Sequence, residues 1–231
     1  MTISYELDRE LGVFELRESF LEHTRQAWNL LPTFETGPPR ILDIGCGTGI
    51  PLLELARLSR GEVVGIDVDE VALSFLRQRA VDADLEDQVT ARCVSLFEAG
   101  FPDSDFDLLW EEGVLHLLET ESSLGECRRL LKPGCHLVMH ETNVWFEKVR
   151  EPLASLGFTI RAEHPLPPRH WLTAYAEPLD ARLHAFMRSH NIDELDDVTT
   201  AALATHRAAV ASIRADPDAT DCSFCIVQKM G

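Results

Sequence analysis

The segment with the clearest chemical character covers residues 41–49, ILDIGCGTG. An apolar run ends in Asp43 and leads into glycines at alternate positions, Gly45, Gly47 and Gly49. Glycine has no Cβ atom, so it adopts positive φ and lets the backbone approach a ligand closely. This pattern predicts a strand, then a tight turn, then the beginning of a helix. In α/β sheets, such a turn is the place where an adenine nucleoside binds.

The spacing of these glycines separates two kinds of nucleoside site. A dinucleotide-binding turn has the pattern GxGxxG and places a pyrophosphate at a helix N-terminus. This chain has GxGxG, and the third glycine of the dinucleotide pattern would fall on Ile50. A nicotinamide-dependent oxidoreductase is therefore disfavoured.

A second acid stands where a ribose would be held. Residues 62–67 are typical of a buried strand, and the strand ends in Asp67, 18 residues after Gly49. A carboxylate there can accept hydrogen bonds from both ribose hydroxyls. The alternative, a cap for the following helix, fits Asp69 better than Asp67.

Motifs between residues 41 and 140 resemble, in the same order, those of the class I S-adenosylmethionine-dependent methyltransferases. They are DIGCGTG at 43–49, the acid Asp67, FPDSDFD at 101–107 followed by VLH at 114–116, and LKPG at 131–134. ETNVWF at 141–146 and WLTAY at 171–175 are similar to segments of a bacterial small-molecule subgroup. The resemblance implies S-adenosyl-L-methionine as cofactor and methyl transfer to a small molecule.

The resemblance also implies which residues hold the cofactor. Arg25 is expected to pair with the methionine carboxylate; the alternative is a surface arginine that balances Glu22. Ser95 and Leu96 stand where many relatives carry an acid or amide, so the Ser95 hydroxyl and the Leu96 N–H are expected on the adenine. The full predicted set is Arg25, Asp43, Gly45, Cys46, Gly47, Asp67, Val68, Ser95, Leu96 and Glu111.

Polar residues after the fourth and fifth strands are candidates for the acceptor side. Open α/β sheets bind ligands at the carboxyl ends of their strands. Methyl transfer needs a positioned nucleophile and exclusion of water, and a base only where the acceptor must lose a proton. The predicted catalytic residues are Glu112, His116 and Glu141. The predicted acceptor contacts are His140, Asn143, Trp145, Trp171 and Tyr175.

Each of these candidates has a structural alternative. Glu112 would then be a solvated loop acid and His116 a helix-surface residue, while Trp171 and Tyr175 would be core aromatics. The net charge of −18 and the adjacent glutamates slightly favour a neutral or cationic acceptor such as an amine. A hydroxyl or a thiol acceptor is also open.

The elements that must position these residues alternate along the chain. Apolar runs predict strands at 40–44, 62–67, 89–94, 106–110, 135–140, from 157, and at 222–228. Helical spacing predicts helices at 15–31, 71–80, 124–131, 145–156, 178–190 and 193–215. This pattern predicts an α/β, Rossmann-like class I methyltransferase fold with a seven-stranded, mostly parallel sheet covered by helices on both faces.

We expect a single domain over residues 1–231. Within it, residues 1–39 form an N-terminal helical cap that ends at a break from Thr36, and residues 40–164 form the cofactor-binding core. Residues 165–220 form a helical insertion or lid, opened by a proline-rich loop at 165–168, and residues 221–231 the last strand. A chain of this length can bury a sizeable core.

Composition narrows the partners and the compartment. The negative charge disfavours nucleic acid and anionic lipid, no apolar run approaches 18 residues, and no signal peptide is visible at the N-terminus. Cys222 and Cys225 fall on opposite faces of a strand, which suits neither zinc nor a redox turn. We therefore expect a cytoplasmic monomer or homodimer without a metal. A non-catalytic S-adenosylmethionine or nucleoside binder is the alternative from another class.

Overall fold

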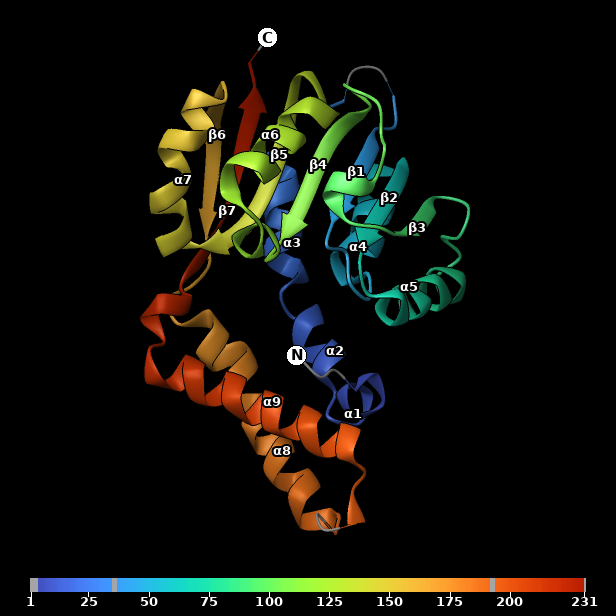
Figure 1. Ribbon diagram of the computed structural model, residues 1–231, viewed down its shortest axis with the longest axis vertical. Helices are drawn as coiled ribbons and strands as arrows, with labels where there is room; N and C mark the ends of the chain where they lie inside the picture. The colour runs from blue at the N-terminus through green and yellow to red at the C-terminus, as the bar shows by residue number, and fades with distance from the viewer. Residues whose placement is uncertain (1–3, 35–36, 192–193, 231) are drawn as a thin grey trace. The chain divides into compact units, whose positions relative to one another are not determined.

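The computed structural model describes residues 4–34, 37–191 and 194–230. A seven-stranded sheet has the strand order β3-β2-β1-β4-β5-β7-β6 (Figure 1). The strands are β1 (Arg40–Ile44), β2 (Glu62–Asp67), β3 (Val89–Cys93), β4 (Phe106–Glu112), β5 (Leu131–Thr142), β6 (Phe158–Pro165) and β7 (Cys222–Lys229). Neighbouring strands are parallel except that β7 runs antiparallel to both β5 and β6. The predicted fold class is confirmed.

The strand order reverses between β1 and β4, which makes their carboxyl ends the expected ligand-binding edge. The chain leaves β1 toward β2 and β3, and later returns to place β4 on the other side of β1. The glycine turn follows β1 and the candidate catalytic residues follow β4 and β5, so the topology gathers them at one edge.

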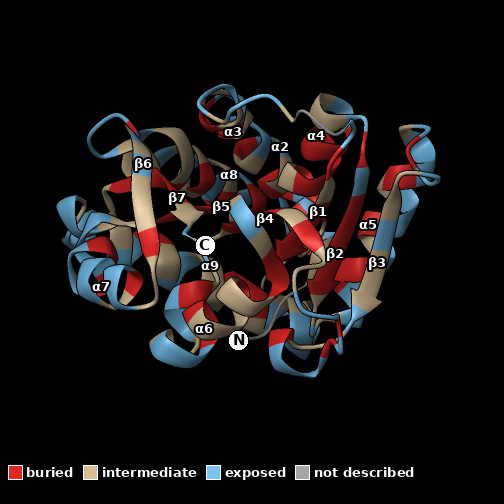
Figure 2. Ribbon diagram, turned by 90° about the horizontal axis from the view of Figure 1, so that it is seen from above, coloured by how far each residue is buried: buried red, intermediate tan, exposed pale blue. Residues whose placement is uncertain are grey.

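Helices cover both faces of this sheet. On one face lie α3 (Leu21–Asn29), α4 (Ile50–Ser59) and α5 (Glu70–Asp82), and on the other α6 (Thr120–Leu130) and α7 (Asn143–Ser155) (Figure 2). Alternate strand residues such as Leu42, Leu109 and Leu137 share one buried core with Leu124 of α6 and Val149 of α7. The residues between them therefore face α3 and α4.

A second compact unit combines two distant stretches of sequence, Met1–Phe20 and Leu166–Asp221, whereas the sheet unit contains Leu21–Pro165 and Cys222–Gly231. Its helices are α1 (Tyr5–Glu10), α2 (Val13–Glu18), a π-helix η3 (Trp171–Ala176), α8 (Glu177–Ser189) and α9 (Asp197–Ala215). It has a core of its own, with Leu7 and Leu11 packed among Leu179, Leu183 and Leu203. Its parts are also joined by polar contacts, because His206 lies 2.7 Å from Asp8 and Arg182 donates to the carbonyls of Leu11 and Gly12.

Several predicted bounds differ from the structure. The helix predicted over 15–31 is two helices, α2 and α3, because its halves belong to different cores. Pro165 is part of β6 rather than of a loop, which an edge strand tolerates. The predicted helix start at Asp193 and the break at Thr36 lie outside the described residues.

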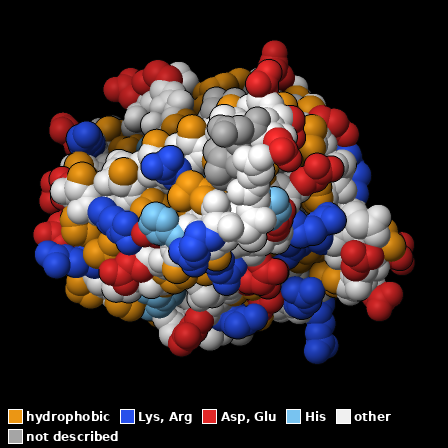
Figure 3. All heavy atoms as spheres, turned by 90° about the horizontal axis from the view of Figure 1, so that it is seen from below, with side chains coloured by type: hydrophobic (Ala, Val, Ile, Leu, Met, Phe, Trp, Pro, Cys, Tyr) orange, Lys and Arg blue, Asp and Glu red, His pale blue; other side chains and the backbone are white. Residues whose placement is uncertain are grey.

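Charged side chains of both signs lie side by side on the face drawn in Figure 3, so the excess of acid is not gathered into one patch there. Within the described ranges, no helix has the length and apolar character needed to cross a membrane.

Candidate active site

The turn after β1 is closed on one side by protein and open on the other. Gly45 N and Cys46 N donate to Ile66 O at 2.8 and 3.1 Å, which holds the turn against β2. At Gly45 (φ +69°) a Cβ would lie 2.8 Å from the Cβ of Val114. At Gly47 (φ +51°) a Cβ would meet no described atom within 4 Å beyond its chain neighbours. The turn therefore offers its backbone to a ligand at Gly47.

The Asp67 carboxylate stands at the rim of this open side. Its Oδ2 accepts from Gly47 N at 2.8 Å and its Oδ1 accepts from Asp69 N at 2.9 Å. Each carboxylate oxygen has a second lone pair, so both can accept further bonds. The two contacts fix the carboxylate in place for a ligand that donates hydroxyl hydrogens.

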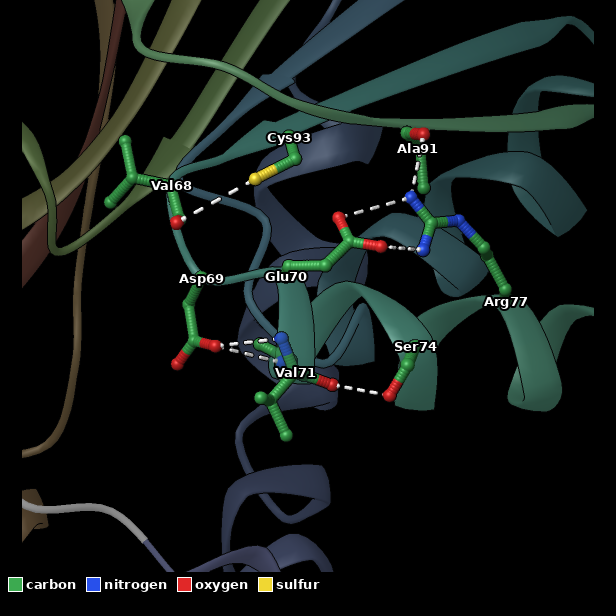
Figure 4. A network of polar contacts seen from close by, with 9 residues as sticks. Val68, Asp69, Glu70, Val71, Ser74, Arg77, Ala91 and Cys93 are labelled. Carbon is green, nitrogen blue, oxygen red and sulfur yellow. Dashed lines mark hydrogen bonds and ion pairs between the residues drawn. The ribbon is translucent and has the colours of Figure 1, made fainter.

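The segment after Asp67 is anchored by α5 (Figure 4). Asp69 Oδ1 accepts from the N–H groups of Val71 and Ala72 at 2.9 and 3.1 Å, as expected for the helix cap. Glu70 and Arg77 pair at 2.6 Å. Val68, between Asp67 and this anchor, is 72% exposed and offers an apolar surface beside the ribose acid.

Ser95 and Leu96 follow β3 at the same edge. Ser95 Oγ donates to Glu98 Oε2 at 2.8 Å, which leaves its lone pairs as acceptors. Leu96 is buried and begins a short 3-10 helix, while Phe97 beside it is half exposed. This arrangement suits the predicted contact of the Ser95 hydroxyl with an adenine amino group.

Asp43 is a buried acid whose Oδ2 has no hydrogen-bond partner within the described part of the chain. Burial, followed by the charges of Glu112 and Asp67, raises the pKa of Asp43 well above its ordinary value. An unsatisfied buried acceptor costs about 1–3 kcal/mol. A cationic ligand group would relieve this cost. S-adenosylmethionine carries an ammonium and a sulfonium, so the residues present fit that cofactor.

Arg25 on α3 is tied to α4. Its Nε donates to Glu54 Oε1 at 2.6 Å, and the Glu54 side chain is buried while that of Arg25 is half exposed. The hydrogen bond to Glu54 raises the pKa of the Arg25 guanidinium. Arg25 is therefore not simply a surface partner of Glu22, and its contact with a methionine carboxylate stays a prediction.

Glu112 faces α3 rather than solvent. Its Oε1 accepts from Thr24 Oγ1 and from Trp110 Nε1, both at 3.0 Å, and its side chain is 7% exposed. Its Oε2 lies 3.8 Å from Nδ1 of His140. The alternative of a solvated loop acid is therefore wrong. Thr24 and Trp110 were missed as partners, although Trp110 lies two residues before Glu112 and so on the same face of β4.

His140 is buried in the same layer. Its ring stacks on Phe224 with centroids 4.4 Å apart, and its Nε2 lies 3.1 Å from Cys222 Sγ. Cys222 and Cys225 are both buried, and Cys225 belongs to the opposite core with α6 and α7. The ring of His140 is thus enclosed by β7, and its contact with an acceptor stays a prediction.

His116 and Glu141 form a hydrogen-bonded pair on the other face. The backbone N–H of His116 donates to Glu141 Oε1 at 3.0 Å, and His116 Nδ1 lies 2.9 Å from Glu141 Oε2. The Glu141 side chain is 2% exposed and that of His116 is 44% exposed. With Nδ1–H donated to the carboxylate, Nε2 of a neutral ring is the acceptor nitrogen. The structure thus brings together two of the three predicted catalytic residues.

The remaining predicted acceptor contacts lie in different surroundings. Asn143 Oδ1 accepts from Ser223 Oγ at 2.7 Å, and Trp145 is buried beside Phe146 in the core. Trp171 and Tyr175 belong to the helical unit, where their rings are 5.3 Å apart. Burial raises the pKa of Tyr175. A lid role for the last two stays a prediction.

Glu111 has a second role that the sequence interpretation missed. Its Oε2 accepts from the N–H groups of Val114 and Leu115 at 3.1 and 3.4 Å, and the residue is fully buried. Val114 packs against Gly45, so the turn that Glu111 holds lies against the glycine turn. The sequence signal that could have indicated this contact is an acid three residues before Val114, with Gly113 between them.

Comparison with known proteins agrees with this geometry. Residues 42–139 match a family model described as a methyltransferase domain. The chain is 33% identical over 101 residues to 27-O-demethylrifamycin SV methyltransferase of Amycolatopsis mediterranei, covering 43% of this chain and 37% of that protein. It is 31% identical over 139 residues to dimethylglycine N-methyltransferase of Parasynechococcus marenigrum, covering 60% of this chain and 46% of that protein.

A solved structure is similar over nearly the whole chain. The crystal structure of the [4+2]-cyclase SpnF has a TM-score of 0.73 and 26% identity, and the match covers 90% of this chain and 81% of that one. The fold is that of the class I methyltransferases. Residues 42–139 are therefore similar to the methyltransferase family, in agreement with the resemblance to S-adenosylmethionine-dependent methyltransferases that the sequence motifs predicted. The chain spans less than half the length of either curated relative.

Proposed function

We propose that this chain transfers a methyl group from S-adenosylmethionine to a small-molecule acceptor, with His116 as general base and Glu141 as its orienting partner. The observation that carries the proposal is the His116–Glu141 pair at the carboxyl ends of β4 and β5. Val114, two residues before His116, packs on Gly45, so the turn that carries His116 contacts the glycine turn, which supports the proposal. The edge of the sheet at which they lie is the expected ligand edge.

The cofactor would be held by residues of the sheet unit. S-adenosylmethionine supplies a methyl group that is already activated by a sulfonium. Asp67 would accept hydrogen bonds from its ribose hydroxyls, and the buried Asp43 would balance its cationic end. Val68, Ser95 and Leu96 would contact its adenine, and Gly45, Cys46 and Gly47 would allow its close approach to the backbone.

His116 would take the proton that the acceptor loses as it becomes a nucleophile. Nε2 is the nitrogen available for this, because Nδ1 is held by Glu141. The buried carboxylate keeps the ring in one tautomer and stabilises the imidazolium that forms. General base assistance of this kind contributes a factor of about 10²–10⁴ in rate. We assign Glu112 to holding α3 on β4, because its Oε1 is engaged by Thr24 and Trp110.

The acceptor class is the finer part of this proposal. An amine is slightly favoured by the acidic charge of the chain, and the relative named dimethylglycine N-methyltransferase supports it. The relative named 27-O-demethylrifamycin SV methyltransferase keeps a hydroxyl acceptor open. His116 would serve either acceptor, because an ammonium and a hydroxyl must both lose a proton.

A second candidate is a protein of the same fold that binds the cofactor without transferring its methyl group. It is favoured by one observation, the similarity to a structure named as a [4+2]-cyclase. The His116–Glu141 pair favours a catalytic role for this site. This role does not require that the reaction uses the cofactor's methyl group. Formation of S-adenosylhomocysteine separates the two candidates.

The test is a screen of amines, phenols and thiols that detects S-adenosylhomocysteine, followed by kinetics of His116→Ala and Glu141→Gln. We expect both substitutions to lower kcat, His116→Ala by about 10²–10⁴-fold, while the cofactor Kd measured by calorimetry stays within about twofold. His184→Ala is the matched control, because His184 lies 3.7 Å from Asp180 on α8 and is exposed. Full activity in both variants would remove the base and leave positioning and water exclusion as the whole mechanism.

We propose the cytoplasm as the compartment and a monomer or homodimer as the assembly. None of the six cysteines, all of which lie in the described ranges, forms a disulfide, which supports a reducing environment. Light scattering after size-exclusion chromatography decides between the two assemblies.

A further inference from the structure

Two carboxyl groups hold three consecutive N–H groups of the turn after β4. Glu111 accepts from Val114 N and Leu115 N at 3.1 and 3.4 Å, and Glu141 accepts from His116 N at 3.0 Å. The same Glu141 carboxylate lies 2.9 Å from the His116 imidazole. The position of His116 therefore depends on two acids from adjacent strands.

The surroundings of these two carboxyl groups differ. Glu141 has the imidazole of His116 beside it, and that ring is 44% exposed. Glu111 is fully buried, and its Oε1 has no hydrogen-bond partner among the residues that the structure describes. The charges that act on Glu111 are those of Glu141 and Glu112, and the group facing it from α6 is the buried thiol of Cys127. These neighbours offer carboxylates and a thiol, but no cation.

A second anion in this place would be costly. An ionised carboxylate buried without a cation loses its hydration, and a like charge beside it adds repulsion. The two backbone N–H groups that donate to Glu111 offset only part of this cost. Burial, with Glu141 as the next contribution, accordingly raises the pKa of Glu111 well above its ordinary value. A neutral carboxyl still accepts the two backbone bonds through its carbonyl oxygen.

We infer that Glu111 is a positioning residue that works as a neutral acid: it fixes the turn that carries His116 and leaves Glu141 as the anion beside the imidazole. Ionisation of Glu111 at alkaline pH would place two anions under one turn, loosen it and misplace His116. The use of this arrangement in catalysis rests on the proposed function. The protonation state of Glu111 and its contacts with the turn are independent of the proposed function.

The first test reads the proton directly. The glutamate carboxyl groups are labelled with ¹³C, which separates their infrared bands from the band of Asp43. Spectra of the labelled wild-type protein and of labelled Glu111→Gln are then compared at neutral pH. We expect the wild-type protein to show a protonated-carboxyl band that is absent from Glu111→Gln and retained in the control Glu147→Gln, an exposed acid on α7. A wild-type spectrum without a protonated glutamate overturns the inference, even if the variant fails to fold.

The second test reads the position of His116 through kinetics, once an acceptor is known. We expect Glu111→Ala to lower kcat by at least tenfold and Glu111→Gln to recover most of that loss, because glutamine keeps a neutral carbonyl acceptor. The alkaline limb of the kcat profile should be weaker in Glu111→Gln than in wild type. Equal losses in both variants, with the infrared band present, would show that the carboxyl group itself is required and would overturn the positioning role. Loss of the rate in Glu111→Ala but not in His116→Ala would instead contradict the proposed base.

Discussion

Asp67 connects three parts of the candidate site through one carboxylate. It joins the glycine turn at Gly47 to the start of α5 at Asp69. An acid with two roles, structural and ligand-binding, needs a control that separates them. Asp69 supplies it, because its carboxylate caps α5 and makes the same kind of bond to backbone N–H groups.

We predict that Asp67→Ala weakens binding of S-adenosylhomocysteine by about 1–3 kcal/mol, the scale for losing hydrogen bonds to a charged acceptor. Titration calorimetry measures it. Asp69→Ala should lower the free energy of unfolding by about 0.5–2 kcal/mol, as expected for a lost cap, and leave the Kd nearly unchanged. Equal Kd values for wild type and Asp67→Ala would show that Asp67 does not hold the ribose.

Residues at strand ends could be predicted from the sequence where position alone sets the role. Asp69 is of this kind, because it caps α5 as predicted. Asp67 ends β2 as predicted, and its contact with a ribose stays a prediction. Glu111 and Glu112 are not of this kind, because their difference depends on which face of β4 each one occupies. The sequence pattern predicted an end to this strand at Trp110, whereas β4 continues to Glu112. Extension of the strand places Glu112 under α3 and Glu111 in the core with α6.

The bounds of helices and strands were predicted well where an element packs in one core. They were predicted poorly where consecutive residues pack in two different cores. Phe20 packs against His170 and Trp171, with centroids 4.7 Å away in each case, inside the helical unit. Thr24 and Ala27 of α3 are buried in the sheet unit. The apolar spacing of residues 15–31 is continuous, so no local signal marks the break between Glu18 and Leu21.

Two glycines, Gly12 and Gly125, test whether the backbone conformation at a glycine decides the effect of replacing it by alanine. Gly12 has φ +61°, and a Cβ there would collide with the Arg182 guanidinium that binds the neighbouring carbonyls. We predict that Gly12→Ala lowers the free energy of unfolding by at least about 1–2 kcal/mol, the cost of a left-handed conformation. Gly125 lies within α6, and a Cβ there would meet nothing within 4 Å. Gly125→Ala should therefore raise the free energy of unfolding by about 0.5–1 kcal/mol. Denaturant titrations measure both variants, and a change of the same sign in Gly12→Ala and Gly125→Ala would contradict this argument.

The contact between α3 and β6 should be sensitive to acid. His23 Nδ1 and His164 Nε2 are 3.2 Å apart, and burial, followed by the charge of His23, lowers the pKa of His164. The unfolded chain therefore takes up this proton first as the pH falls below the ordinary histidine pKa of about 6.5. Stability should fall with pH in that window down to the lowered value.

We predict that His164→Gln flattens this dependence, because glutamine cannot be protonated there. Denaturant titrations between neutral and mildly acidic pH measure the change, and His184→Gln on α8 is an exposed control. Parallel curves for wild type and His164→Gln would show that this histidine does not carry the acid sensitivity.

At the scale of the whole molecule, two compact units each have their own core. The alternation of strands and helices was sufficient to predict the sheet and its fold class. The membership of the helical unit was not predictable, because six of the seven strands separate its two stretches in the sequence and only packing joins Leu7 to Leu179 and Leu203. The predicted cap at 1–39 contains the first stretch of this unit together with α3 of the sheet unit, and the predicted insertion at 165–220 overlaps the second stretch.

Ligand binding gives a prediction for the complete chain. A ligand at about 100 times its Kd stabilises the folded state by about 2.7 kcal/mol. We expect S-adenosylhomocysteine to raise the unfolding temperature in this way and NAD to leave it unchanged, because the turn has the GxGxG spacing. A scan of thermal unfolding by circular dichroism measures both. A rise with NAD and none with S-adenosylhomocysteine would contradict the assigned cofactor.

The origin of the helical unit from two distant stretches has a consequence during synthesis. Residues 4–20 leave the ribosome early, but their partners in Leu166–Asp221 follow only after Leu21–Pro165 has been made. At about 5–20 residues per second this interval is on the order of 10 s. During it the apolar side chains of Leu7, Leu11 and Leu16 lack the core that buries them in the finished protein. Residues 4–20 are therefore among the last parts to fold, and a nascent-chain chaperone would find its binding segment there.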